Sequence, residues 1–401
     1  MATSGIAASL LDGGTTAHSR FKIPIALTDT STDDINKRDD AADTIRRCAL
    51  LVWDKAGMAH RRAIEAVDRT VRDIRDNDAP FGGLLTVFAG DWQQILPVVK
   101  GGARHQVVGA CLKASPLWQE IMCMTLHTNM RVQLQGDLDA GEYAQFLAEL
   151  GSGKLPLCPG TPDTVQLPPA VLSPARTLDE LVDRIYPDLA QNLPDLDWLE
   201  ERAILTVLNS DAKKVNVLII KRLPGPEVVY TSIDSMADPD AVPLTTEVLN
   251  NIELSGMPAH KIRLKTGAPV ILIRNLDAPR VVNGTLCVVK TPLQNVLELT
   301  VLTGPDRGHS IFVPRLPLES SADSGLGFSF RRLQFPVSVA FGMTINRSQG
   351  QTKKRVGVCL TNPVFSHGQL YVAMSRVGTI GGIELFGGPT TRNVVYPEVL
   401  L

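Results

Sequence analysis

The chain has 401 residues, of which 44% are hydrophobic and 20% are charged, as is typical of folded globular proteins. Its net charge of −2 excludes a protein that coats nucleic acid through bulk positive charge, so any DNA contact must be local. No apolar stretch approaches the roughly 20 residues of a membrane-spanning helix, no signal-peptide pattern opens the chain, and the six cysteines include no C-x-x-C pair. We therefore expect an intracellular protein of two or three domains with reduced cysteines and no zinc site.

The first segment of interest, residues 5–24, reads GIAASLLDGGTTAHSRFKIP and joins a helix-like piece to a glycine pair. Three polar side chains follow the glycines, namely Thr16, His18 and Ser19. Taken alone, a glycine pair with hydroxyl groups nearby predicts no more than a turn.

The next segment, LLVWDKAGMAH, ends an apolar run at Asp54. An aspartate just past a buried strand is where a nucleotide-hydrolysing enzyme holds its magnesium ion. The next residue is Lys55, whereas such an enzyme usually has a glutamate there that activates the attacking water. The lysine indicates either that this is no such site or that the site is damaged.

Several segments share one pattern, in which a continuous apolar run is closed by a polar residue. They are CALLVWD (48–54), LLTVFAGD (84–91), AILTVLN (203–209), VSVAFGMT (337–344) and VGVCL (356–360). Such runs predict strands buried on both faces of a parallel sheet. Helical patterns lie between them, as in residues 60–76, where apolar side chains recur at spacings of three and four. The alternation predicts an α/β fold whose ligands bind at the carboxyl ends of the strands, near Asp54, Asp91 and Thr344.

The domain organisation follows from two changes in composition. A proline-rich interval at residues 154–174 is typical of a linker, so we place a boundary near residue 150. From residue 264 to 313, short strand-like pieces alternate with Gly, Pro and Asn turns, which predicts a small β-domain inserted into the second α/β unit. The expected segments are 1–150 for the first α/β domain, 151–255 and 326–401 for the second, and 256–325 for the insert.

Four further segments carry polar groups that suit a phosphate or nucleic acid. Gln94 in AGDWQQILPVV can report a terminal phosphate or cap a strand, and Arg131 in LHTNMRV can bind phosphate or form a surface ion pair. FGMTINRSQGQT, residues 341–352, packs polar side chains around Gly350. HGQLYVAMSRV predicts a helix that ends in Arg376, in the manner of an arginine finger. The basic clusters at residues 331–332 and 353–355 are candidates for DNA contact or solvated surface charge.

In this order, the segments resemble the Pif-type (petite integration frequency) family of DNA helicases, including the helicase region of Helitron transposons. The matching stretches are GIAA…GGTTAHS, the aspartate strand, GDWQQILPV, LHTNMR, LTVLN, the Asn283-Gly284 turn, MTINRSQGQT and FSHGQLYVAMSRV, and they cover nearly the whole chain. The resemblance implies two RecA-like (P-loop NTPase) domains with parallel sheets and a shared ATP site, the first of them incomplete, plus a small β-barrel inserted in the second. It also implies ATP-driven movement along single-stranded DNA in the 5′-to-3′ direction.

The resemblance assigns roles to individual positions. Asp54 matches the magnesium-binding aspartate, Gln94 the phosphate-sensing glutamine, and Arg131 and Arg376 the arginines that approach the terminal phosphate. Two groups of residues complete the expected site: Thr16, His18, Ser19, Thr344, Asn346 and Ser348 for DNA, and Gln349 and Gly350 for coupling to ATP. The implied ligands are ATP, Mg²⁺, single-stranded DNA and DNA junctions. The implied setting is repair, recombination and telomere maintenance in the nucleus or mitochondrion, without a membrane.

The resemblance fails in two main places. Nothing fits G-x-x-x-x-G-K-[ST], the loop that cradles phosphates, and the nearest stretch, GSGKL at residues 151–155, has leucine after its lysine. In the family this loop precedes the segment that opens the present chain, so we expect the chain to be truncated. The second departure is Lys55, where the general base is expected, and lesser ones are Thr15 and Gln93 in place of arginines. We therefore expect no ATPase or unwinding activity from the isolated chain.

Three alternatives stay open at this point. Lys55 can pair with a phosphate oxygen and permit nucleotide binding without turnover, which still needs the phosphate loop. The chain can be a remnant that binds single-stranded DNA without consuming ATP, which salt-sensitive and nucleotide-independent binding would favour. It can also be a transposon-derived reading frame under no functional demand, which a failure to fold cooperatively would favour, since a sheet without its first strand has an exposed edge.

Overall fold

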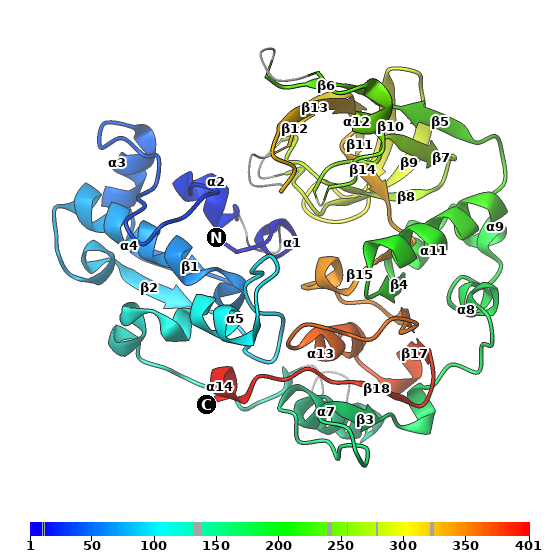
Figure 1. Ribbon diagram of the computed structural model, residues 1–401, viewed down its shortest axis with the longest axis horizontal. Coiled ribbons are helices and arrows are strands. Elements are labelled where there is room, and N and C mark those ends of the chain that lie inside the picture. The colour runs from blue at the N-terminus through cyan, green and yellow to red at the C-terminus, as the bar shows by residue number, and fades with distance from the viewer. Residues whose placement is uncertain are drawn as a thin grey trace. The chain divides into compact units, whose positions relative to one another are not determined.

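A computed structural model describes residues 1–9, 11, 13–130, 138–238, 243–254, 256–277, 280–320 and 325–401 (Figure 1). The chain forms two compact units. Unit 1 comprises Met1–Leu172, Ser348–Thr352 and Leu360–Leu401, and unit 2 comprises Ser173–Arg347 and Lys353–Cys359. Within the described ranges, no helix is long and apolar enough to cross a membrane.

The elements of unit 1 are mostly helical. Its helices are α1 (Gly5–Ser9), α2 (Ala17–Phe21), α3 (Asp40–Arg47), α4 (Arg61–Arg75), α5 (Arg104–Ala110), α7 (Leu138–Gly151), α13 (Gln369–Met374) and α14 (Pro397–Leu400). Its strands are β1 (Leu50–Trp53), β2 (Leu85–Phe88), β3 (Thr164–Gln166), β17 (Ile383–Phe386) and β18 (Thr390–Arg392). Short 3-10 turns are η1 (Ala56–Met58), η2 (Pro80–Gly83), η3 (Leu112–Ala114), η4 (Pro116–Glu120), η5 (Pro169–Val171) and η8 (Ile380–Gly382).

The elements of unit 2 are mostly strands. They are β4 (Arg202–Thr206), β5 (Val228–Thr231), β6 (Ile233–Met236), β7 (Lys261–Leu264), β8 (Pro269–Leu272), β9 (Leu286–Pro292), β10 (Val296–Val301), β11 (Ser310–Pro314), β12 (Leu316–Glu319), β13 (Phe330–Gln334), β14 (Val337–Val339), β15 (Gly342–Thr344) and β16 (Arg355–Cys359). The helices are α8 (Leu178–Ile185), α9 (Leu189–Asn192), α10 (Leu196–Glu200), α11 (Asn209–Arg222) and α12 (Thr246–Asn250). The turn η7 (Ile345–Ser348) follows β15 at the passage back to unit 1.

Strands β1 and β2 form the parallel pair that ends at the candidate site. Trp53, on the inner face, is 1% exposed and belongs to the same hydrophobic core as the apolar stripe of α4. The outer face is not covered, because Leu50 is 49% and Leu85 is 66% exposed. The strands and their parallel pairing are therefore as predicted, but burial on both faces is wrong for this pair, since only one of its faces packs against described helices.

Helix α4 shows why the sequence folds as expected beside these strands (Figure 1). The His60 side chain accepts a hydrogen bond from the Arg62 amide at its start, and Asp76 ends it in the left-handed conformation. The spacing of its apolar residues buries one stripe of the helix against the sheet. This helix holds β1 and hence Asp54 in place.

Unit 2 contains a parallel sheet in which β15, β4 and β16 lie side by side in that order. The predicted strand at residues 337–344 is divided: β14 pairs with β8 in an antiparallel sheet, and β15 pairs with β4. Phe341 lies at the break, fully buried, and its carbonyl accepts a hydrogen bond from the Tyr186 hydroxyl at 2.8 Å. One apolar run thus serves two sheets, which period-based reasoning does not separate.

The β-rich part of unit 2 is antiparallel, in sheets of order β11-β10-β9-β8-β14, β12-β13-β6 and β5-β7. Strands from residues 228–236 and 330–339 contribute to it, beyond the expected insert at 256–325. Its closure into a barrel stays a prediction, as do the boundaries at 150, 255 and 325. The proline-rich interval is partly packed in unit 1, because β3 pairs with β18, and the division into units falls inside this interval after Leu172.

Asp33 is a buried acid in unit 1 that leads to a stability prediction. It is 7% exposed, neither carboxylate oxygen has a partner among the residues described, and burial raises its pKa to about 7. In the unfolded chain the Asp33 carboxyl ionises near pH 4. Its contribution to the free energy of unfolding therefore falls as pH rises from about 4 to about 7, and it stays low above pH 7. We expect Asp33→Asn to stabilise the protein at pH 8 by about 1–3 kcal/mol and to have little effect at pH 4.

Urea denaturation at the two pH values measures this effect. The matched control is Asp34→Asn, because Asp34 is the exposed neighbour in the chain. Equal stabilisation by both substitutions, or none by Asp33→Asn at pH 8, contradicts the assignment.

Candidate functional site

Asp54 lies at the carboxyl end of β1, where the sequence placed it. Its backbone is held by Thr3, whose amide donates to the Asp54 carbonyl at 3.0 Å, and by Met1, whose carbonyl accepts from the Asp54 amide at 2.9 Å. The carboxylate is half-buried and makes no hydrogen bond or ion pair within the described part of the chain. It is therefore available to a ligand.

Lys55 follows in an unusual conformation. Its φ of 58° is left-handed, which is uncommon for a residue with a side chain and is frequent at functional sites. The Thr3 hydroxyl donates to the Lys55 carbonyl at 2.7 Å and accepts from the Trp53 indole at 3.0 Å. The Thr3 hydroxyl thus links the Lys55 carbonyl to the Trp53 indole.

The Lys55 side chain reaches a cluster that we call the Gln94 node, comprising Lys55, Asp91, Gln94, Gln349 and Tyr371. Gln94 Oε1 accepts from Lys55 Nζ at 3.2 Å and from Gln349 Nε2 at 2.9 Å. Gln94 Nε2 donates to Asp91 Oδ2 at 3.0 Å, and the Tyr371 hydroxyl donates to the same oxygen at 3.1 Å. The node joins four segments of unit 1 that are far apart in the sequence.

Asp91 fixes the loop that presents Gln94. Its Oδ1 accepts from the Gln93 amide at 2.9 Å, and its carbonyl accepts from the Gln94 amide at 3.1 Å. An aspartate that closes a turn on its own backbone is a common device after a strand. The sequence marked Asp91 only as a strand end, and the G-D-x-x-Q spacing was the signal for its role as the support of Gln94.

Arg376 is buried, with 6% of its surface exposed. Its guanidinium donates to the carbonyls of Val372 at 2.7 Å, Gln351 at 2.8 Å and Ser348 at 3.3 Å. In this conformation it holds the 348–351 loop against α13. Approach to a phosphate would require some of these bonds to be exchanged, so its role as an arginine finger stays a prediction.

The other predicted site residues differ in accessibility. Thr16 is the N-cap of α2 and accepts from the Ser19 amide at 3.2 Å, while His18 and Ser19 are exposed. Thr344 is 9% and Ser348 is 1% exposed. Asn346 is half-buried, Gly350 has a φ of +91°, and Arg131 lies outside the described residues. The α2 surface is thus the most accessible part of the expected DNA site.

The two basic clusters have structural roles. Arg332 is buried on Asp234, and Arg331 pairs with Glu319. Lys353 donates to the Glu200 carbonyl at 2.6 Å, and burial lowers its pKa to about 8. The buried members, Arg332 and Lys353, therefore serve neither of the two expected roles, which were DNA contact and solvated surface charge.

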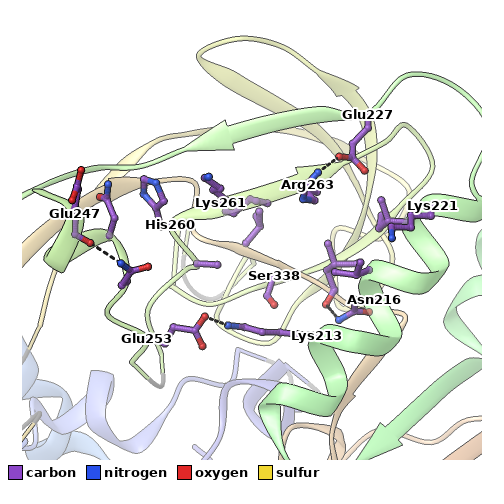
Figure 2. A pocket seen from close by; sticks show the side chains of 18 residues that line it. Lys213, Asn216, Lys221, Glu227, Glu247, Glu253, His260, Lys261, Arg263 and Ser338 are labelled. Atoms are coloured by element: carbon purple, nitrogen blue, oxygen red, sulfur yellow. Dashed lines mark hydrogen bonds and ion pairs between the residues drawn. The ribbon is translucent and has the colours of Figure 1, made fainter. Parts of the chain in front are cut away.

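A cavity of about 810 Å³ lies in unit 2 between α11, α12 and β7 (Figure 2). Ion pairs of Lys213 with Glu253 and of Arg263 with Glu227 neutralise much of its rim. None of the predicted site residues lines it. No motif in the sequence of α11 indicated this cavity.

The fit of a magnesium ion depends on Asp54. Within the described residues, no group of three or more His, Cys, Asp or Glu side chains can hold a metal ion. Mg²⁺ is usually bound by one or two carboxylates together with substrate phosphates, which the free Asp54 carboxylate allows. The neighbouring ammonium of Lys55 opposes a second cation. The residues therefore fit Mg²⁺ only as a companion of bound phosphates.

Known proteins to which this chain is similar belong to one family. The sequence model of PIF1-like helicases matches residues 1–158, and that of the Pif1 2B domain matches residues 247–291. The ATP-dependent DNA helicase Pif1 of Bdellovibrio bacteriovorus is 23% identical over 100% of this chain and 80% of its own length. PIF1 of Danio rerio is 26% identical over 96% of this chain and 53% of its own length, so the chain spans about half of that relative.

Solved structures agree with this family. Pif1 from Bacteroides, in complex with ADP-AlF3 and single-stranded DNA, superposes with a TM-score of 0.68 at 23% identity and covers 100% of this chain and 84% of its own. Pif1 from Candida albicans gives a TM-score of 0.65 at 23% identity, covering 100% and 86%. At this identity the likeness concerns the fold, and it confirms the predicted RecA-like α/β architecture.

Proposed function

We propose a function from one premise: this chain belongs to the PIF1-like family of ATP-dependent DNA helicases. The proposed family activity is that of an ATP-dependent 5′-to-3′ DNA helicase. For this chain we propose binding of single-stranded DNA and ATP without hydrolysis, because Lys55 replaces the general base. Repair, recombination and telomere maintenance, in the nucleus or mitochondrion, are the proposed setting. The Helitron connection stays a prediction.

The observation that carries the proposal is the Gln94 node. It gathers residues from the aspartate strand, the G-D-x-x-Q loop, the 348–351 loop and α13, the segments that the family resemblance assigns to the ATP site. Bound Mg²⁺ would neutralise phosphate charge beside Asp54. Gln94 and Gln349 present amide groups that can bind phosphate oxygens or water.

Lys55 contributes to the proposed loss of turnover. A protonated amine cannot accept the proton of the attacking water, and Lys55 Nζ is bonded to Gln94 Oε1. Loss of a positioned base typically lowers the rate ~10²- to 10⁴-fold. The ammonium instead suits a phosphate oxygen, which favours binding without hydrolysis.

A second candidate function is nucleotide-independent binding of single-stranded DNA. It is favoured by Lys55, which stands where the general base is expected and donates to Gln94 Oε1 at 3.2 Å, so that the site lacks a group to activate water. The two functions differ in one respect, because only the first predicts that ATP changes the affinity for DNA.

Binding of a fluorescent oligothymidine, followed by anisotropy between 50 and 300 mM salt, tests the DNA function. We expect affinity to fall steeply with salt, because phosphate contacts release counterions. His18→Glu, on the exposed surface of α2, should weaken binding about tenfold or more by charge repulsion with the phosphates. The control His105→Glu changes an exposed histidine on α5 of the same unit. Absence of binding, or equal losses in both variants, contradicts the proposal.

A further inference from the structure

His367 connects three segments of unit 1 through both of its ring nitrogens. It is 1% exposed, its Nε2 lies 2.7 Å from the Trp92 carbonyl oxygen, and its Nδ1 lies 2.8 Å from the Tyr396 amide nitrogen. Trp92 belongs to the loop of the Gln94 node, and Tyr396 precedes α14. His367 itself lies two residues before α13 begins.

These partners determine a single protonation state of the ring. A backbone amide can only donate, so Nδ1 must be an unprotonated acceptor. A carbonyl oxygen can only accept, so Nε2 must carry the hydrogen. The buried ring is therefore neutral, with its proton on Nε2. A second proton on Nδ1 would face the Tyr396 N–H and break that bond.

The neighbouring contacts show what the imidazole holds. Gly368 has a φ of +68°, and a Cβ there would lie 2.2 Å from the Gln93 carbonyl oxygen, so loop and helix start touch backbone to backbone. The Gly368 amide donates a hydrogen bond to the Val394 carbonyl at 3.0 Å. Tyr371, one turn further along, reaches Asp91 of the node. The loop that carries Gln94 is thus in direct contact with the start of the helix that leads to Arg376, next to His367.

We propose that His367 is a positioning residue: a neutral imidazole that holds the Gln94 loop and the chain segment before α14 against the start of α13. The inference rests on the proposed function only in treating Gln94 and Arg376 as site residues. The contacts of the ring are independent of any ligand.

The same geometry makes the contact sensitive to acid. The charged groups that face the ring are Asp91 from the loop, Arg104 from α5 and Glu398 from α14, and burial is the main cause that lowers the His367 pKa below its usual value. In the unfolded chain the imidazole takes up its proton near pH 6.5. The contribution to stability is therefore present above pH 6.5 and is lost as pH falls towards the lower pKa of the folded state.

Two substitutions separate the two bonds. Asparagine can place its carbonyl oxygen near the position of Nδ1, but its amide N–H groups do not reach the Trp92 carbonyl. Glutamine can place an amide N–H near the position of Nε2, but its carbonyl oxygen does not lie at the position of Nδ1. In native-state hydrogen exchange of the 401-residue chain, His367→Asn should lower protection of the amides of residues 91–96 about 3- to 10-fold and spare the Tyr396 amide. His367→Gln should show the reverse pattern. His105→Asn is the control.

Two further readouts complete the test. The ¹⁵N shifts of the wild-type imidazole should report the Nε2–H tautomer. The melting temperature should fall between pH 7 and pH 5 by more in the wild type than in either His367 variant. Equal loss of protection at both segments in both variants, the Nδ1–H tautomer, or unchanged pH profiles would overturn the inference. These results do not depend on DNA or nucleotide binding, so they are distinguishable from failure of the proposed function.

Discussion

Replacing Arg332 by methionine should lower the free energy of unfolding of unit 2 by about 3–5 kcal/mol, because it leaves a buried carboxylate without its partner. The side chains of Arg332 and Asp234 are 1% and 0% exposed. Arg332 Nη2 lies 2.6 Å and Nε 3.1 Å from Asp234 Oδ2. Its remaining donors bind the carbonyls of Leu249, Ile252 and Pro258. Removal of the guanidinium therefore leaves both a buried charge and several carbonyls unsatisfied.

The neighbouring arginine provides a matched control. Arg331 pairs with Glu319, and both side chains are about half exposed. Solvent screens such a pair, so Arg331→Met should cost less than about 1 kcal/mol. Chemical denaturation followed by circular dichroism compares the two variants. A loss of less than 1 kcal/mol in Arg332→Met would show that the Arg332 pair contributes little to the stability of the β12-β13-β6 sheet.

Replacing Lys55 by glutamate should make unit 1 dependent on a divalent cation. The variant loses the bond from Nζ to Gln94 Oε1 and places a carboxylate beside that oxygen and next to Asp54 in the chain. In EDTA we expect destabilisation of about 1–3 kcal/mol. Millimolar MgCl₂ should restore part of it, because two carboxylates bind Mg²⁺ better than one carboxylate beside an ammonium.

Lys55→Met separates the two effects of this change. It removes the hydrogen bond without adding a negative charge, so it should be destabilised without responding to MgCl₂. Thermal melting of the wild type and both variants, with EDTA and with MgCl₂, is the measurement. A response to MgCl₂ that is equal in all three proteins contradicts the proposed role of Asp54 as a magnesium ligand.

The elements with strong local signals were predictable. The apolar runs that became β4 and β16 were recognisable because a buried parallel strand needs continuous apolar residues. The runs of β1 and β2 have the same pattern, although one face of this pair is exposed. Helix α4 followed from its period. The approach of Gln94 and Gln349, which are 255 positions apart, was implied only by the family resemblance.

Features that depend on tertiary contacts were not predictable from local pattern. The run at 337–344 divides at Phe341 because Tyr186 packs there at a centroid distance of 5.3 Å, and no periodicity encodes that contact. Arg332 and Lys353 looked like surface charge, but their partners come from distant segments. The contacts of His367 and Tyr371 were not predicted from the sequence. The only pattern that they show is two polar residues four positions apart around the start of α13.

The most direct test of the whole account is ATP hydrolysis by the 401-residue chain and its Lys55→Glu variant, with and without saturating oligothymidine, beside the DNA-binding assay. We expect DNA binding by both proteins and hydrolysis at background in both, because the protonated Lys55 cannot act as a base and these residues contain no phosphate-loop motif. DNA-stimulated hydrolysis by the wild type would contradict the assignment of Lys55 as the disabling residue. Hydrolysis by Lys55→Glu alone would show that the phosphate-loop motif is not needed.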